Sequence, residues 1–168
     1  MKTIAILKIL AKFCAIAAGL LLIFITLMTC TSIVGRDLIG KTIVGDFELS
    51  GAAAGAAIAL FMPWCQVKRG NIVVDFFTTR APAAAQNAMD RIGALLLGCV
   101  MALMAWRTTI GGLNSLRTNS ETQILGLPEW IVYAAMVPPL ALTVLIALHQ
   151  AFFGFEEQTT EDNPELAV

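Results

Sequence analysis

The side chains that could perform chemistry are few and far apart in this sequence. The single histidine, His149, and the four cysteines lie in or beside long apolar segments; the cysteines are Cys14, Cys30, Cys65 and Cys99. Zinc and redox sites usually hold Cys or His pairs at short spacings, and no such pair occurs here. A glycine-rich phosphate loop, a nucleophile elbow, an HExxH motif and a paired-carboxylate site are also missing. We therefore predict that the chain is not an enzyme and has no metal or cofactor of its own.

The composition points to a membrane protein. Of the 168 residues, 58% are hydrophobic and 14% are charged, whereas a soluble domain carries roughly 25% charged residues. The apolar residues also stand in long uncharged blocks, which is typical of transmembrane segments. The formal net charge of -1 provides no basic field that would favour nucleic acid. We expect membrane lipid around the chain and no nucleic-acid partner.

The uncharged blocks predict an all-α integral membrane protein with four transmembrane helices. The first block is longer than the roughly 7–15 apolar residues of a signal peptide, so we expect it to be retained. The third is charge-free only over Ile92–Trp106, and we expect Arg91 and Arg107 to reach the lipid headgroups. Pro138-Pro139 lies near the middle of the fourth. The predicted spans are about 13–34, 49–67, 88–110 and 130–155.

Two connections show apolar residues at helical spacing, which predicts short amphipathic helices in the membrane interface. A plain loop with scattered apolar residues is the alternative. The residues are Ile39, Ile43, Val44 and Phe47 in the first connection, and Ile72, Val73, Phe76 and Phe77 in the second.

The distribution of lysine and arginine predicts the orientation. Seven of them lie in the N-terminal segment and the second connection, and four lie in the first and third connections. Because basic residues favour the cytoplasmic side, both termini should be cytoplasmic. Residues 1–155 would form the membrane domain. Residues 156–168 carry five acidic residues and no basic one, which predicts a disordered tail.

Small residues at the start of the second span are candidates for an interface. Gly51, Ala54 and Gly55 lie in a run of alanine and glycine, and such a face lets another helix backbone approach closely. Glu48 precedes this run. It is interpreted as a charge favoured at a helix start, as the partner of Arg36 or Arg107 in an ion pair, or as a contact to a partner subunit.

Four further residues are candidates for positions at the membrane boundary. Arg69 and Asp75 could pair around the cytoplasmic turn, although Arg69 could equally be an ordinary positive-inside charge. Trp130 and Tyr133 open the last span. They could anchor it at the headgroups on the other side, as aromatic-belt residues do.

The order of several motifs resembles the small membrane subunit, of the DctQ type, of TRAP (tripartite ATP-independent periplasmic) transporters. That family shows an Arg after its first span and an acidic residue before a small-residue stretch, here Arg36 and Glu48. An Arg-Gly-His-Ile-x-Val-Asp-like motif follows, matched by Arg69–Asp75. Leu125–Tyr133 is similar to the family's Leu-Gly-Ile-Pro-x-Trp-x-x-Tyr element. The likeness extends from about Phe13 to Phe155.

The sequence departs from the family pattern at three places. Asn71 replaces the usual His, Pro138-Pro139 stands where a Pro and a small residue are frequent, and Glu48 stands alone where many members have two acidic residues. These differences bear on the roles of the individual residues.

The resemblance implies a division of labour in a bacterial inner-membrane complex. A large membrane subunit would carry the substrate by symport, usually with sodium, and a periplasmic binding protein would deliver small carboxylates. This chain would be an accessory scaffold without a transport path. The alternative is a self-contained small oligomeric transporter or channel, for which the candidate polar residues are Thr26, Thr29, Thr31, Gln66 and His149.

Overall fold

The computed structural model describes residues 2–68 and 83–153, and these residues form four long helices. Each helix is long and apolar enough to cross a membrane, which confirms the predicted all-helical architecture with four spans. Within the described residues, the only extended pairing is an isolated bridge between Glu121 and Pro128. The helices are α1 (Lys2–Ile39), α2 (Asp46–Val67), α4 (Ala83–Thr118) and α5 (Trp130–Phe153).

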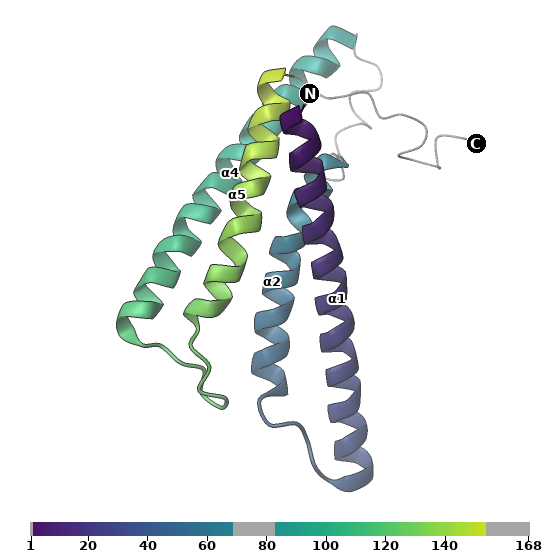
Figure 1. The fold of residues 1–168 in the computed structure, drawn as a ribbon, viewed down its shortest axis with the longest axis vertical. Coiled ribbons are helices and arrows are strands. Elements are labelled where there is room, and N and C mark those ends of the chain that lie inside the picture. Colours follow the sequence, from purple (N-terminus) through teal and green to yellow (C-terminus); the bar gives the residue numbers. More distant parts are fainter. Residues whose placement is uncertain (1, 69–82, 154–168) are drawn as a thin grey trace, which may run out of the picture.

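The helices stand side by side in a row, in the order α4, α5, α2, α1 (Figure 1). Extensive contacts join α4 to α5, α5 to α2 and α2 to α1. The contact of α1 with α5 is smaller and includes the buried cluster of Ala11, Leu142 and Ile146. The start of α1 and the end of α5 lie at one end of the row, here called the N-terminal end (Figure 1). Residues 40–45 and 119–129 connect helices at the other end, here called the loop end. The cytoplasmic location of the N-terminal end stays a prediction.

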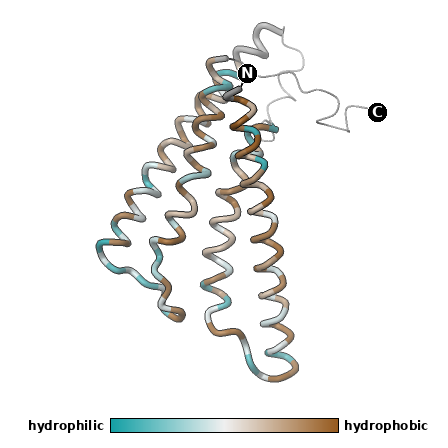
Figure 2. Tube along the Cα trace, in the orientation of Figure 1, coloured by the Kyte–Doolittle hydropathy of each residue, from teal (hydrophilic) through white to brown (hydrophobic). Residues whose placement is uncertain are grey.

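Helix contacts in this row rest on small side chains. Ala11, Ala57 and Ala147 are fully buried, whereas Phe13 and Leu103 are 73% and 63% exposed. Hydrophobic residues cover the helices along most of their length (Figure 2). Since lipid is as apolar as leucine, a membrane helix gains little by hiding large side chains, and it packs on its neighbours through small ones.

Glycines of α4 bring α5 especially close. A Cβ atom built at Gly98 would lie 3.4 Å from Ala147 Cβ, and one built at Gly112 would lie 2.9 Å from Tyr133 Cβ. The second distance is shorter than real Cβ contacts allow, so only glycine fits at position 112. The α4 and α5 backbones therefore approach each other closely at Gly112 and Tyr133.

The central helices α2 and α5 are also joined by polar side chains at the N-terminal end. Gln66, only 5% exposed, donates from Nε2 to Gln150 Oε1 at 2.7 Å. Gln150 Nε2 donates in return to the backbone carbonyl of Gln66 at 3.1 Å. Buried amides need such partners, because an unpaired polar group in an apolar interior is costly.

The interfacial helix predicted in the first connection is not formed. Ile39 is the last residue of α1, Phe47 lies in the first turn of α2, and residues 40–45 between them are not helical. Gly40, directly after α1, and Gly45, directly before α2, have φ angles of 69° and 77°, a left-handed conformation that interrupts a helix. The second predicted interfacial helix, at 72–77, lies outside the described residues, as does the tail 156–168.

The helices also extend beyond some of the predicted spans. The helix α1 begins at Lys2, well before position 13, and α4 covers Ala83–Thr118 around the predicted 88–110. Hydropathy marks where a helix can meet hydrocarbon, whereas backbone hydrogen bonding continues until a glycine or a turn stops it.

Candidate functional site

Glu48 joins the two helical hairpins at the loop end. It lies in the first turn of α2, and its Oε1 accepts a hydrogen bond from the Ile124 N–H at 3.0 Å. Its Oε2 accepts from the Leu125 N–H at 3.1 Å and from the Ile124 N–H at 3.2 Å. The carboxylate thus holds the loop between α4 and α5, here called the α4–α5 loop (residues 119–129), against the start of α2.

Gly45 leaves the space in which Leu125 of this loop packs. A Cβ atom at Gly45 would lie 2.3 Å from Leu125 Cγ, which leaves no room for a side chain. Its φ of 77° also suits glycine far better than other residues. Gly45 and Glu48 together therefore fix Leu125 over the beginning of α2.

The α4–α5 loop has internal hydrogen bonds that present its amides to Glu48. Thr122 N–H donates to Leu127 O at 2.9 Å, and Gly126 N–H donates to Thr122 O at 3.0 Å. The Thr122 hydroxyl oxygen accepts from Leu127 N–H at 3.0 Å. Gly126 has a φ of 62°, which allows the chain to turn there. The N–H groups of residues 124 and 125 remain outside this turn and bind one carboxylate.

A second acidic residue fixes the connection between α1 and α2. The hydroxyl of Ser32, which is 2% exposed, donates to Asp46 Oδ2. The Ile43 N–H donates to Ser32 Oγ at 3.3 Å, and the Phe47 N–H donates to Asp46 Oδ1 at 2.7 Å. Asp46 therefore ties the end of α1 to the start of α2 and sets how far apart the two helices stand at the loop end.

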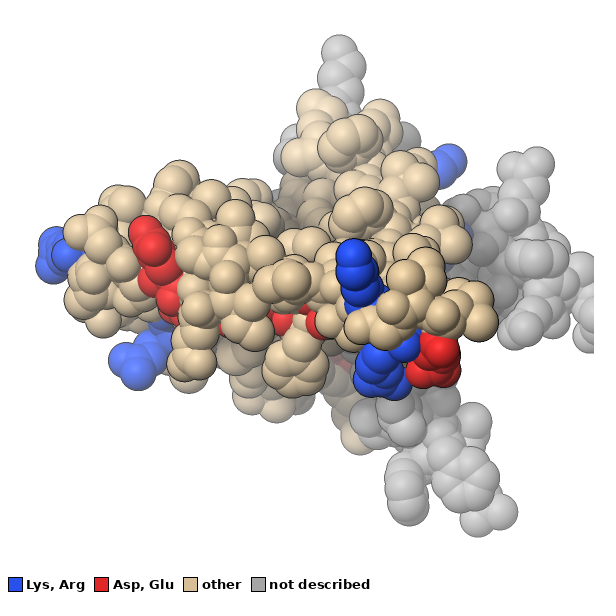
Figure 3. Space-filling model, turned by 90° about the horizontal axis from the view of Figure 1, so that it is seen from below, with Lys and Arg blue, Asp and Glu red and all other residues tan. Residues whose placement is uncertain are grey.

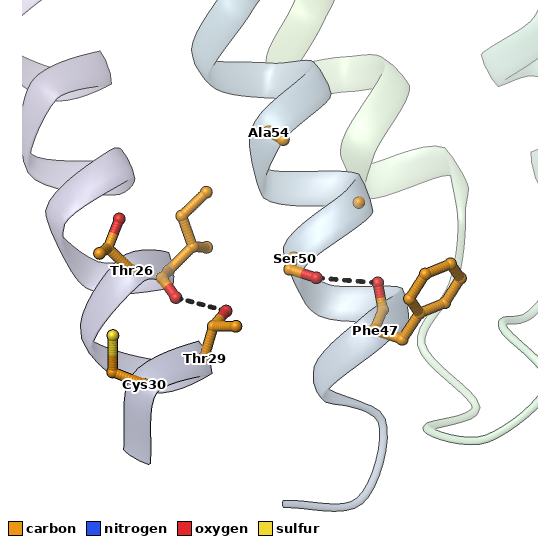
Figure 4. Close-up of a pocket in the computed structure, with 8 residues that line it drawn as sticks. Thr26, Thr29, Cys30, Phe47, Ser50 and Ala54 are labelled. Carbon is orange, nitrogen blue, oxygen red and sulfur yellow. Dashed lines mark hydrogen bonds between the residues drawn. The ribbon is translucent and has the colours of Figure 1, made fainter. Parts of the chain in front are cut away.

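A groove of about 500 Å³ runs between α1 and α2 on the N-terminal side of this turn. In Figure 4, Thr29 of α1 and Ser50 of α2 face the groove from opposite sides. The hydroxyls of the groove donate to carbonyls of their own helices, as from Thr29 to Ile25 at 2.8 Å, so the groove offers mostly apolar surface. Its lining residues are Ile25, Thr26, Thr29, Cys30, Phe47, Ser50, Gly51 and Ala54.

The small-residue face predicted as a helix contact opens onto this groove. Gly51 and Ala54 line it, and a Cβ atom built at Gly51 or Gly55 would meet nothing within 4 Å. The alanines on another side of α2 make the contacts within the chain, among them Ala57, which is fully buried. The glycine face of α2 is thus left uncovered by the described residues.

The other predicted residues lie in different places. Tyr133 packs against Gly111 and Gly112 of α4, and with Trp130 it lines a second groove, of about 280 Å³, between α4 and α5. Arg36 lies 3.7 Å from its neighbour Asp37 in an exposed ion pair. Arg69 and Asp75 lie outside the described residues.

Sequence reasoning missed several residues that build the loop end. Gly45 and Gly112 have steric roles, and Ser32 has a polar role. A glycine directly before the acidic start of α2 and the pair Gly111-Gly112 directly after the third predicted span were available signals. Their partners lie far away in the sequence, so the signals could not say what these residues contact.

Charges at the loop end form no continuous patch. Figure 3 views this end and shows Lys, Arg, Asp and Glu at separate places among uncharged residues. In the described part of the chain, no three His, Cys, Asp or Glu side chains lie close enough together to hold a metal ion. Shape and apolar contact therefore dominate the chemistry of this surface.

One comparison with known proteins gives a match. The family model described as "Tripartite ATP-independent periplasmic transporters, DctQ component" matches residues 25–157. That range includes the groove between α1 and α2, the Glu48 contact and the α4–α5 loop. No curated protein and no solved structure matches the chain.

Proposed function

Since the chain belongs to the family of DctQ components of tripartite ATP-independent periplasmic transporters, we propose that it is the small scaffold subunit of such a transporter. In this proposal a large membrane subunit carries small carboxylates by sodium-coupled symport across a bacterial inner membrane. A periplasmic binding protein delivers the substrate. The family match supports the place in the transporter, and the division of labour is our inference.

The uncovered glycine face of α2 is the observation that carries the scaffold role. Gly51 and Gly55 have open space in front of them, beside a mostly apolar groove. In a membrane, helices associate where small residues let the backbones approach. We propose that a helix of the large subunit lies against Gly51, Ala54 and Gly55.

The loop end is the surface that we propose for the binding protein. Its two connections are held in place by Asp46 and Glu48, and apolar side chains project from them. Val44 is 69% exposed and Ile124 is 58% exposed. A surface already fixed before contact loses little conformational entropy on binding, which favours a transient docking partner.

Co-purification of the large subunit with variants of this chain tests the scaffold role. Gly51→Leu and Gly55→Leu place a large side chain on the proposed contact, and the Cβ atom of each would meet nothing within 4 Å in the chain itself. Overpacking a helix contact costs about 1–3 kcal/mol, so recovery of the large subunit should fall about tenfold at limiting concentration. Gly93→Leu is the matched control, because Gly93 also faces open space but lies on α4.

Equal recovery with all three variants would contradict the proposed contact. A second experiment tests the scaffold role itself: vesicles containing only this chain should show no substrate flux. The groove threonines already donate to carbonyls of their own helix, as Thr26 does to Leu22 at 2.8 Å, which supports that expectation. Flux through the chain alone would favour a small oligomeric channel instead.

A further inference from the structure

Arg107 lies on the face of α4 that points away from the rest of the row. The residues of α4 that face α5 include Gly98 and Gly112, and Met101 packs in the same cluster as Leu140 of α5. Arg107 follows Gly98 by nine residues, which at about 100° per residue places it on the opposite side of the helix. Its side chain is exposed. Its position is therefore at the outer edge of the protein, where α4 ends the row (Figure 1).

The side chains on this face of α4 change from aliphatic to charged and polar along the helix. Leu103, Val100 and Leu96 precede Arg107 by four, seven and eleven residues and so share its face. They are 63%, 55% and 61% exposed. Asn114, seven residues beyond Arg107, is also exposed. Toward the N-terminal end this face is aliphatic, whereas Arg107 and Asn114 make it cationic and polar toward the loop end, where Ile110, 44% exposed, lies at its edge.

The charge-free length of α4 is too short for an ordinary bilayer. Ile92–Trp106 has fifteen residues, which span about 22 Å, whereas the hydrocarbon core is roughly 30 Å thick. An arginine facing hydrocarbon is costly, and it is accommodated by reaching for the headgroups or by thinning the bilayer. The shortfall is shared between the two ends of this run, Arg91 and Arg107, and at the loop end it brings the guanidinium of Arg107 to the level of the lipid tails.

We propose that Arg107 binds the phosphate of a phospholipid in the leaflet at the loop end. One acyl chain of that lipid lies along Leu103, Val100 and Leu96, and the bilayer is thinner beside α4 than beside the other helices. Guanidinium groups bind phosphate oxygens through paired, charge-assisted hydrogen bonds. The order of side chains, aliphatic and then cationic, matches the order of tail and headgroup in a phospholipid.

A protein helix fits this face less well than a lipid does. Protein helices associate in membranes through faces of small residues. In the described part of this chain such a face is uncovered on α2, at Gly51 and Gly55, whereas the outer face of α4 has one glycine in open space, Gly93. The outer face of α4 instead carries branched aliphatic side chains. A flexible acyl chain can adapt to such a surface without close approach of two backbones. The proposal needs only that the chain crosses a membrane, so it stands or falls separately from the scaffold role.

Lipid retention measured by native mass spectrometry tests the phosphate contact. The full chain is released from phosphatidylcholine vesicles, and bound phospholipid is counted for three variants. Arg107→Gln should reduce the retained lipid about tenfold, which corresponds to about 1.4 kcal/mol and to one charge-assisted hydrogen bond. Arg107→Lys keeps the charge and should retain most of the lipid.

Arg117→Gln is the matched control. Arg117 is an exposed arginine of the same helix, but it lies ten residues further toward the loop end, about 15 Å beyond the proposed phosphate. Its loss should leave lipid retention unchanged. Equal retention in wild type and Arg107→Gln would overturn the proposal. So would a loss of the large subunit from Arg107→Gln without any loss of lipid, because Arg107 would then pair with a protein carboxylate.

The depth of Trp106 tests the thinner bilayer. Trp106 is 68% exposed and adjoins Arg107. In a protein that carries Trp64→Phe and Trp130→Phe, Trp106 is the single tryptophan. The quenching of its fluorescence by brominated phosphatidylcholines then reports its depth in the bilayer. Bromines near the headgroup should quench it more than bromines deep in the chains, and Arg107→Gln should shift the preference toward the deep bromines. Stronger quenching by deep bromines in the parent protein would overturn the proposal.

Discussion

Glu48, in the first turn of α2, accepts a hydrogen bond from the backbone N–H of Leu125 at 3.1 Å, across 77 positions of sequence. Leu125 belongs to the α4–α5 loop, only five residues before α5 begins. The contact therefore joins α2 and α5 at the loop end, as the Gln66–Gln150 pair joins them at the N-terminal end. The two central helices of the row are held together at both ends.

Removing the Glu48 carboxylate should release the α4–α5 loop. In Glu48→Ala the N–H groups of Ile124 and Leu125 lose the acceptor that the structure gives them. Their hydrogen exchange, measured by mass spectrometry on the protein in detergent, should become faster. Asp37→Ala is the control, because Asp37 forms an exposed ion pair with its neighbour Arg36. Unchanged exchange at both amides in Glu48→Ala would show that the loop is held by other contacts.

Gly45→Ala should destabilise the protein more than Gly40→Ala does. Both glycines have left-handed φ angles, 77° and 69°, so each alanine pays about 1–2 kcal/mol for its backbone conformation. Only the Cβ at position 45 also meets Leu125, at 2.3 Å from its Cγ, and such overpacking adds about 1–3 kcal/mol. Unfolding in mixed SDS micelles measures the difference.

The same pair offers a rescue experiment. Leu125→Ala removes the atoms that the new Cβ would strike, so it should restore part of the stability lost in Gly45→Ala. If the two substitutions were simply additive, Gly45 and Leu125 would not be in contact. Additive effects would therefore contradict the packing of the α4–α5 loop on the start of α2.

Gly112→Ala should push α5 away from α4. The added Cβ would lie 2.9 Å from Tyr133 Cβ, an atom that cannot move without its backbone, and we expect a loss of about 1–3 kcal/mol. Gly93→Ala, where the Cβ meets nothing within 4 Å, should gain about 0.5–1 kcal/mol from helix propensity. Opposite shifts of the thermal unfolding midpoint are the expected result, and equal shifts would count against this contact.

The Gln66–Gln150 pair should behave as a coupled unit. Gln66→Leu leaves Gln150 without its 2.7 Å donor and should cost about 1–3 kcal/mol. Adding Gln150→Leu also removes the amide oxygen that has lost its donor, so the double variant should be more stable than the sum of the single losses predicts. A double-mutant cycle on unfolding free energies measures this, with a coupling of roughly 0.6–1.7 kcal/mol expected. A coupling of zero would mean that the two amides do not depend on each other.

The helices were predictable because hydrophobicity is a local property. An uncharged run such as Phe13–Val34 must avoid water wherever it lies, and α1 contains that run. The ends of α1 and α4 were less predictable, because helical hydrogen bonding continues past the apolar segment. The apparent interfacial helix at 39–47 failed for the opposite reason: its spacing suits a helix, but two left-handed glycines interrupt it.

Most contacts of the candidate site could not be predicted from the sequence. The spacing of Gly51 and Gly55 indicated a close-packing face, and the structure leaves that face open while alanines of α2 make the internal contacts. Glu48 was singled out, but its partners are backbone N–H groups. Every residue has a backbone N–H, so no residue type in the loop marks it as the partner of a carboxylate.

The single row of α4, α5, α2 and α1 (Figure 1) has a mechanical consequence. In a bundle each helix is braced from several directions, whereas here each one is braced mainly along the line, with additional packing of Ala11 of α1 on Leu142 and Ile146 of α5 at the N-terminal end. Curving the row about an axis parallel to the helices merely rolls neighbouring contacts, while curving it across the helices would break their backbone hydrogen bonds. We therefore expect the chain to bend more easily in the plane of the membrane than perpendicular to it. Such a row would adapt to a curved neighbouring surface while resisting displacement along the membrane normal.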